Sequence, residues 1–297
     1  MELLAQFYQL HTTTALGLVA LFSLMVGSFL NVVVHRLPIM LDREWRSQCL
    51  EFLDHPEPDT NRAVPDKYNL VFPRSSCPQC GHQIDAWQNI PVLSYLLQKG
   101  KCRHCDKPIS PRYPVTEIMT MILSVIVIGQ LGPNWHSVSF LFLTWSLIAL
   151  SLIDFDHKLL PDDITLPVMW AGLALALTGI GPVDVKSSLA GAIIGYGSLW
   201  LIFQLFRLAT GKEGMGYGDF KLFALLGAWL GWQQLPLIII LSSFVGAAVG
   251  IGNILIRNHH RSTPIPFGPF LCAAGFIAML WGDTLIDQYL QLMRIRF

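Results

Sequence analysis

Residues 12–34 have the sequence TTTALGLVALFSLMVGSFLNVVV, which contains no charged side chain. At about 1.5 Å of rise per residue, a helix of this length crosses the hydrocarbon core of a bilayer. A cleaved signal peptide would need a basic segment before a shorter apolar stretch. Residues 1–11 contain no Lys or Arg, and the first basic residue, Arg36, follows the apolar stretch. The sequence therefore predicts a first membrane-spanning helix.

The composition of the whole chain agrees with a membrane protein. Hydrophobic residues make up 53% of the 297 residues and charged residues 13%, whereas soluble domains carry roughly 25% charged residues. The 20 Lys and Arg residues balance 20 Asp and Glu residues, so no overall charge attracts the chain to nucleic acid. We expect the lipid bilayer, and no nucleic acid, as its surroundings.

Further uncharged stretches predict the remaining spans, and they are residues 118–135, 137–153, 164–183, 187–206, 222–256 and 262–282. Most are about one membrane helix long, but 222–256 is too long and is interrupted at residues 231–234 before Pro236. We divide it into helices beginning near Phe220 and Pro236. The prediction is an all-α polytopic protein with about eight transmembrane helices, of which the sixth has the shortest apolar part.

The basic residues orient these helices. With an external N-terminus, 17 of the 20 Lys and Arg residues fall in segments on one side, and cytoplasmic loops carry such an excess. The N- and C-termini are therefore predicted to be periplasmic. The predicted domains are a first helix (1–35), a cytoplasmic insert (36–113) and a seven-helix membrane domain (114–297).

Two Cys-x-x-Cys pairs lie in the insert, formed by Cys77, Cys80, Cys102 and Cys105. Two residues between thiols let both sulfurs of a tight turn face one ion, and two such turns complete a tetrahedral zinc site. Gly81 supplies the positive φ that such a turn often needs. Four thiolates leave no open coordination position, which predicts structural rather than catalytic Zn²⁺.

Two other interpretations of the insert stay open: a mixed ligand set that uses His82 or His104, or no metal at all. A cytoplasmic location argues against disulfides. Cys49 and Cys272 have no partner at a useful spacing and are predicted to be inert.

Acidic residues are rare in the apolar part of the chain and gather at two places. Residues 154–163 contain Asp154, Asp156, Asp162 and Asp163, and residues 211–221 contain Asp219. The predicted topology puts both groups at the cytoplasmic membrane face. Two adjacent carboxylates do not both ionise readily, so one can activate a water while the other donates a proton.

The glycines at 214, 216 and 218 would leave space for a substrate backbone beside this pair. Two alternatives remain for the acids: an ion or proton pathway, and helix capping by Asp219 with simple loop charge at Asp156, Asp162 and Asp163. Neither a Walker A motif nor G-x-S-x-G occurs in the chain.

Together these motifs resemble the bacterial type IV prepilin leader peptidases over nearly the whole chain. The matching segments are GSFLNVV (27–33) with HRLP (35–38), both Cys-x-x-Cys pairs, SLID (151–154) with LPD (160–162), and GYGDFK (216–221). The last segment is similar to the GxGD signature of intramembrane aspartyl proteases. The resemblance implies Asp154 and Asp219 as the catalytic pair, and Cys77, Cys80, Cys102 and Cys105 as zinc ligands.

The resemblance also implies an inner-membrane enzyme with two activities. It would remove a short basic leader from prepilins and type II secretion pseudopilins, usually between Gly and Phe. It would then methylate the new N-terminus with S-adenosylmethionine. No G-x-G-x-x-G follows a predicted strand, so the methyl-donor site is expected only by resemblance, near residues 100–102.

Two competing classes are a transporter or channel, and a scaffold of an export machine. A transporter would more often place charges near the bilayer midplane and show paired halves, but no internal repeat is evident. A scaffold would not need converging acids. No residue pattern indicates an oligomeric state.

Overall fold

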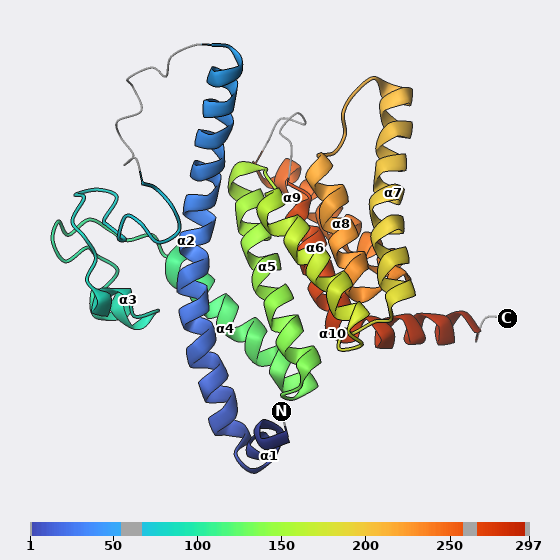
Figure 1. The fold of residues 1–297 in the computed structure, drawn as a ribbon, viewed down its shortest axis with the longest axis horizontal. Coiled ribbons are helices and arrows are strands. Elements are labelled where there is room, and N and C mark those ends of the chain that lie inside the picture. Colours follow the sequence, from blue (N-terminus) through green and yellow to red (C-terminus); the bar gives the residue numbers. More distant parts are fainter. Residues whose placement is uncertain (1, 55–66, 258–265, 295–297) are drawn as a thin grey trace. The chain divides into compact units, whose positions relative to one another are not determined.

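The computed structural model describes residues 2–54, 67–257 and 266–294 (Figure 1). The described chain is helical and without β-strands, apart from two isolated bridges between Ser76 and Gln83 and between Lys101 and Pro108. The longer helices are α1 (Glu2–Leu10), α2 (Thr12–Phe52), α4 (Arg112–Leu131), α5 (Trp135–His157), α6 (Asp162–Leu177), α7 (Val185–Thr210), α8 (Tyr217–Leu230), α9 (Leu235–Arg257) and α10 (Gly268–Arg294). Shorter ones are η2 (Ala86–Asn89), α3 (Leu93–Leu97) and η3 (Trp232–Gln234).

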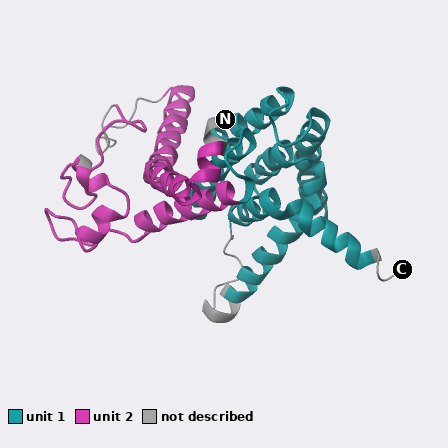
Figure 2. Ribbon diagram, turned by 90° about the horizontal axis from the view of Figure 1, so that it is seen from below, with its two compact units in different colours: residues 1–5, 130–297 teal, residues 6–129 magenta. Residues whose placement is uncertain are grey.

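The chain divides into two compact units (Figure 2). One comprises residues 6–129 and contains α2, α3 and α4. The other comprises residues 1–5 and 130–297 and contains α5 to α10. Each unit is described separately below.

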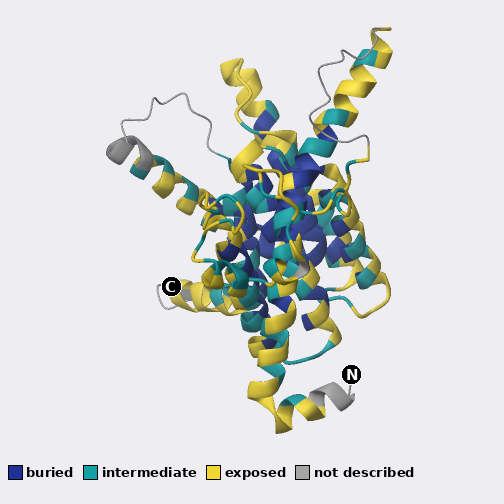
Figure 3. Ribbon diagram, turned by 90° about the vertical axis from the view of Figure 1, so that its left-hand side faces the viewer, coloured by how far each residue is buried: buried dark blue, intermediate teal, exposed yellow. Residues whose placement is uncertain are grey.

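Each expected membrane helix has a counterpart, in α2 and α4 to α10. Six helical stretches within the described ranges are long and apolar enough to cross a membrane, in α2, α4, α5, α7, η3–α9 and α10. The helices α6 and α8 have only 16 and 14 residues, less than the roughly 20 that a span needs, so eight spans are not confirmed. Exposed residues line the outer faces and ends of the long helices (Figure 3), as in a multi-pass membrane protein.

Helix α2 is longer than its apolar stretch indicates. It continues through Pro38 to Phe52, well into the segment expected to begin the insert. Residues 39–52 are mostly good helix formers, and an ion pair one turn apart joins Asp42 to Arg46 at 2.9 Å. The loss of hydrophobicity after residue 35 therefore marks a change of surroundings and not the end of the helix. The predicted topology places the loop between the last two expected spans, residues 257–261, in the cytoplasm, and most of this loop lies outside the described residues.

The short helix α8 forms the core of the second unit. From Leu222 to Leu230 every residue is buried, and α6, α7 and α10 pack around it. A helix that is apolar on all sides needs such surroundings. The Trp229 indole N–H donates to the Val168 carbonyl of α6 at 2.8 Å, so the one polar group of this buried side chain has a hydrogen-bond partner.

Helices α7 and α8 touch through their backbones. A Cβ on Gly191 of α7 would overlap the carbonyl of Gly227 in α8, and a Cβ on Gly227 would overlap that of Gly191. One turn further along α7, a Cβ on Gly195 would lie 2.7 Å from the Phe223 carbonyl oxygen. Small residues one turn apart allow this close approach of the two helix backbones. The contact therefore sets the position of α8 relative to α7.

Candidate active site and metal centre

Asp154 lies in the last turn of α5 and is 5% exposed. The helix ends at His157, where Lys158 adopts the left-handed conformation (φ 53°) and donates its N–H to the Asp154 carbonyl. The Asp154 side chain is held from another helix, because its Oδ2 accepts the backbone N–H of Gly268 at 3.0 Å. The carboxylate is therefore buried and oriented.

Asp219 lies in the first turn of α8 and is 8% exposed. The residues around it are fixed by aromatic packing: the rings of Tyr217 and Phe220 each lie within 5.5 Å of the Phe203 ring of α7, centroid to centroid. The N-cap of α8 is Gly216, which has no side chain to make the capping hydrogen bond. The Asp219 carboxylate, three residues later, instead has a hydrogen bond with the main chain of Gly216, so helix capping remains an alternative role for Asp219.

Leu160, in the loop between α5 and α6, brings the two aspartates together. A Cβ on Gly218, next to Asp219, would lie 2.8 Å from the Leu160 Cβ, and a Cβ on Gly268 would lie 3.3 Å from the Leu160 Cδ2. Gly268 is the residue that binds Asp154. The carboxylates of Asp154 and Asp219 interact electrostatically. Two acids 65 positions apart in the sequence thus converge at one place.

Two of the glycines before Asp219 pack against neighbouring side chains. A Cβ on Gly214 would lie 2.9 Å from the Phe206 ring, and Gly218 faces Leu160 at similar range. Close packing against Phe206 and Leu160 therefore gives these two glycines a role inside the protein, and the expected space for a substrate stays a prediction. A Cβ placed on Gly216 would have one neighbour within 4 Å among the described residues, the Asp219 Oδ2 at 3.7 Å.

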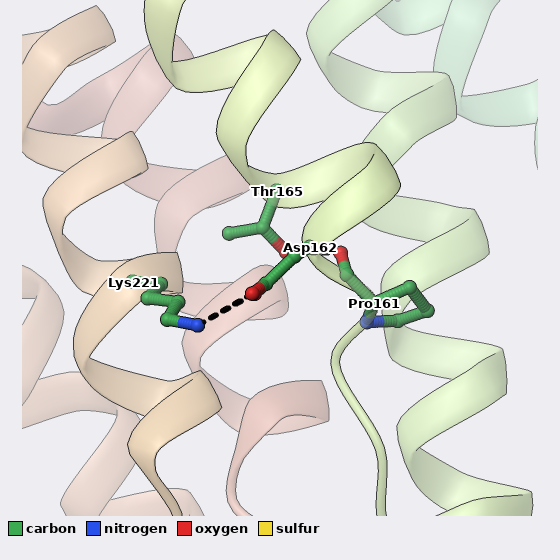
Figure 4. Close-up of polar contacts among 4 residues, drawn as sticks. All are labelled: Pro161, Asp162, Thr165 and Lys221. Carbon is green, nitrogen blue, oxygen red and sulfur yellow. Dashed lines mark hydrogen bonds and ion pairs between the residues drawn. The ribbon is translucent and has the colours of Figure 1, made fainter. Parts of the chain in front are cut away.

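The remaining acids do not join the pair. Asp162 begins α6, and both of its carboxylate oxygens accept from the Lys221 Nζ of α8 at 2.7 Å (Figure 4). The Thr165 hydroxyl donates to the Pro161 carbonyl at 2.8 Å and closes the first turn of α6. Asp156 and Asp163 are exposed. Asp162 therefore ties α6 to α8 beside the aspartates.

Sequence reasoning missed two residues near the acids, both on α10. Gly268 binds Asp154, and the buried Cys272 lies within electrostatic range of both Asp154 and Asp219. Gly268 and Pro269 are typical of a helix start, but no pattern connects them with an aspartate 114 residues earlier.

The four cysteines of the insert form one cluster, with all four sulfurs within 4.8 Å of one another. The Sγ atoms of Cys77 and Cys105 lie 3.9 Å apart. This is too long for a disulfide but close to the edge of about 3.8 Å in a tetrahedron with Zn–S of about 2.3 Å. The cluster could hold a metal ion. The rings of His82 and His104 instead stack on each other, 4.4 Å apart.

The two Cys-x-x-Cys turns have the same backbone hydrogen bonding and conformation. The N–H groups of Cys77 and Cys102 donate to the carbonyls five residues later, both at 2.9 Å. After each pair comes a residue with positive φ, Gly81 (71°) or Asp106 (54°), which confirms the expected turn geometry. The sequence does not reveal this repeat, because the segments 75–84 and 100–109 share little beyond their cysteines.

The thiols of the cluster do not ionise alike. Main-chain hydrogen bonds from Cys80 and Gln79 lower the pKa of Cys77 to about 7. A main-chain hydrogen bond from Lys107 acts to lower the pKa of Cys105, but desolvation and the neighbouring thiols outweigh it and raise this pKa to about 12. Such uneven sharing of protons is typical of thiols packed together.

Fold and site together define a polytopic helical protein with two converging buried aspartates and a separate four-cysteine cluster. Two family models match the chain: "Bacterial Peptidase A24 N-terminal domain" over residues 21–131 and "Type IV leader peptidase family" over residues 141–251. No solved structure matches it.

Similar proteins cover almost the whole chain. One from Aeromonas salmonicida is 56% identical over 276 residues, which is 92% of this chain and 93% of that protein. One from Pseudomonas aeruginosa is 53% identical over 91% of this chain and 92% of that protein, and one from Legionella pneumophila is 46% identical over 92% and 93%. All three are named prepilin leader peptidase/N-methyltransferase. The chain belongs to the type IV leader peptidase family.

Proposed function

We propose that this chain removes the leader from type IV prepilins and pseudopilins with the carboxyl groups of Asp154 and Asp219. The observation that carries the proposal is the convergence of these two buried acids from the ends of α5 and α8. Family membership and the names of the relatives support it.

The chemistry needs one proton shared by the two acids. The ionised carboxylate takes a proton from water, the resulting hydroxide attacks the scissile carbonyl carbon, and the protonated carboxyl hydrogen-bonds the developing oxyanion. Breakdown of the tetrahedral intermediate breaks the C–N bond, and a carboxyl group gives its proton to the leaving amine. The pair then carries one proton again, so it turns over unchanged.

The second proposed activity is methylation of the new α-amino group. S-adenosylmethionine, when bound, would supply an electrophilic methyl group: its methyl–sulfur bond would break as the N–C bond forms, S-adenosylhomocysteine would leave, and the amine would lose a proton. This activity is supported by family membership and by the names of the relatives. At Gly100, near the expected donor site, a Cβ would lie 2.9 Å from the Tyr95 hydroxyl, so local packing already accounts for the glycine.

The proposed setting is the bacterial inner membrane, with periplasmic termini and residues 36–113 in the cytoplasm. The proposed domains are residues 1–35, 36–113 and 114–297. Within the insert, Cys77, Cys80, Cys102 and Cys105 bind one structural Zn²⁺, a role supported by the spacing of their sulfurs. The leader of a membrane-anchored prepilin would then meet the aspartates from the cytoplasmic side.

One experiment tests both activities. Detergent-solubilised protein is incubated with a prepilin and S-adenosylmethionine, and the mass of the product's N-terminal peptide is measured. We expect loss of the leader and a gain equal to one methylene group. An intact leader contradicts the peptidase proposal, whereas a trimmed but unmethylated product contradicts only the second activity.

A further inference from the structure

We propose that Gly268 is a positioning residue, whose backbone N–H holds the Asp154 carboxylate in its reactive orientation. The inference rests on the proposed function, because it concerns how one of the two proposed catalytic acids is oriented. It is carried by three observations: a hydrogen bond, a steric requirement for glycine, and the absence of another restraint on Asp154 among the described residues.

The hydrogen bond joins two helices. Gly268 is the first residue of α10, and its N–H lies 3.0 Å from the Asp154 Oδ2. The first N–H groups of a helix have no acceptor within that helix, so the carboxylate satisfies a donor that would otherwise be buried without a partner. The partial positive charge at the N-terminus of a 27-residue helix also favours an ionised acceptor there.

The same position has no space for a side chain. A Cβ on Gly268 would lie 2.6 Å from the Asp154 Oδ2 and 3.1 Å from its Cγ. It would also lie 3.3 Å from the Leu160 Cδ2. Any other residue would therefore push the carboxylate out of its present orientation. Glycine here both donates the hydrogen bond and makes room for its acceptor.

The bond restrains only one of the two oxygens of Asp154. Its Oδ1 accepts no hydrogen bond from any residue that the structure describes, so this oxygen is available to a water molecule. A carboxylate held by one oxygen cannot rotate freely about χ2, and small misplacements of a reacting group cost much rate, on the order of 10²-fold.

The first test is Gly268→Ala. We expect kcat for leader cleavage to fall about 10²-fold, while KM for the prepilin stays within a few-fold. Methylation of a synthetic pilin peptide that already lacks its leader should stay at the wild-type rate, which shows that the variant is folded. A wild-type kcat for cleavage would overturn the inference.

A control on the same helix is Gly275→Ala, whose Cβ would lie 2.5 Å from the Leu226 Cδ2, in the α8 core. It produces a similar overlap but involves neither aspartate, so we expect lower thermal stability with kcat within a few-fold. An equal loss of kcat in both variants would mean that any disturbance of α10 abolishes cleavage, and would overturn the specific role of Gly268.

A double variant, Gly268→Ala with Leu160→Ala, separates the two overlaps. Because Leu160 itself packs beside both acids, the double variant is compared with Leu160→Ala alone. If the loss came from pressing on Leu160, the two would cleave at the same rate, and the inference would be wrong. If it came from displacing Asp154, the double variant stays about as far below Leu160→Ala as Gly268→Ala is below the wild type. The reference is Asp154→Asn: normal cleavage by that variant contradicts the proposed function, whereas an inactive Asp154→Asn beside a fully active Gly268→Ala contradicts only the positioning role.

A second measurement does not depend on any Gly268 variant folding. Phe267–Gly268 is the one Phe-Gly pair in the sequence, so labelling Phe with ¹³C and Gly with ¹⁵N gives a single identifiable amide signal. In the wild type we expect the downfield shift of an amide that donates to a carboxylate, and in Asp154→Ala an upfield change. An unchanged Gly268 signal would overturn the inference.

Discussion

Different local contacts position the side chains of Asp154 and Asp219. Asp154 depends on the end of α5, where Lys158 turns the chain, and on the N–H of Gly268 from α10. Asp219 depends on the beginning of α8, which the rings of Tyr217 and Phe220 fix against α7. Because each carboxylate is buried beside the other, replacing either should affect chemistry more than folding.

We expect Asp154→Asn and Asp219→Asn each to abolish leader cleavage, because an amide can neither accept a proton from water nor share one with the remaining acid. Both variants should still methylate a peptide that lacks the leader. The measurement is N-terminal mass analysis of the products.

The control for these variants is Asp163→Asn, at an exposed acid in the same segment of the chain as Asp154, residues 154–163. It should cleave at the wild-type rate. Normal processing by either Asp154→Asn or Asp219→Asn would remove that residue from the proposed pair.

At the scale of helices, the position of Asp219 depends on how α8 packs. Gly191 and Gly227 allow α7 and α8 to approach backbone to backbone, and α6 is joined to α8 through Trp229 and through the ion pair of Asp162 with Lys221. These contacts hold α8, which has only 14 residues, in place.

We expect Gly191→Ala to lower the free energy of unfolding by about 1–3 kcal/mol or more, because a backbone–backbone overlap cannot be relieved by a side-chain rotation. The matched control is Gly197→Ala in the same helix, where a Cβ would meet no atom of the described residues within 4 Å. Thermal unfolding in detergent compares them, and equal midpoints would contradict the packing argument.

The Asp162–Lys221 ion pair should contribute modestly, because its side chains are 51% and 29% exposed. A double-mutant cycle of Asp162→Asn and Lys221→Met should give a coupling energy of about 0.2–1 kcal/mol that decreases as salt is added. Independent effects of the two substitutions would show that the pair does not join α6 to α8 in solution.

At the scale of the whole molecule, the four-cysteine cluster lies in the 6–129 unit and the aspartates in the other. The insert of 67–111 contains few buried residues and only short helices, so a metal is the natural means of holding its two knuckle turns together. We therefore expect the cluster to have a structural role that is separable from cleavage chemistry.

We expect about one Zn²⁺ per purified chain, as a tetrahedral site of four thiolates predicts, and its removal by a chelator should make the insert sensitive to proteolysis. Cys77→Ser and Cys102→Ser should each abolish stoichiometric zinc, whereas Cys49→Ser, at an exposed cysteine outside the cluster, should retain it. Metal analysis of the three variants is the measurement. Full zinc content in Cys77→Ser would contradict the ligand set.

Much of the architecture could be predicted because it depends on local patterns. Uncharged stretches indicated each membrane helix, the interruption at residues 231–234 separated α8 from α9, and the cysteine spacing indicated one cluster. The end of α2 at Phe52 was missed, because a helix can continue after its surroundings become polar. Spanning of the membrane by α6 and α8 stays a prediction, because burial within the protein also selects apolar residues in helices of 16 and 14 residues.

The helical class, the aspartates and cysteines as candidate residues, and the family resemblance could all be inferred from the sequence, since each rests on residue type and spacing along the chain. The three-dimensional fold was needed to show that Gly268 binds Asp154, that Leu160 packs beside Gly218 and Gly268, and that neighbouring side chains fill the space next to Gly214 and Gly218. The physical reason is that these contacts join residues far apart in the sequence, up to 114 positions, or depend on the volume of a neighbour, and neither is encoded in a local pattern.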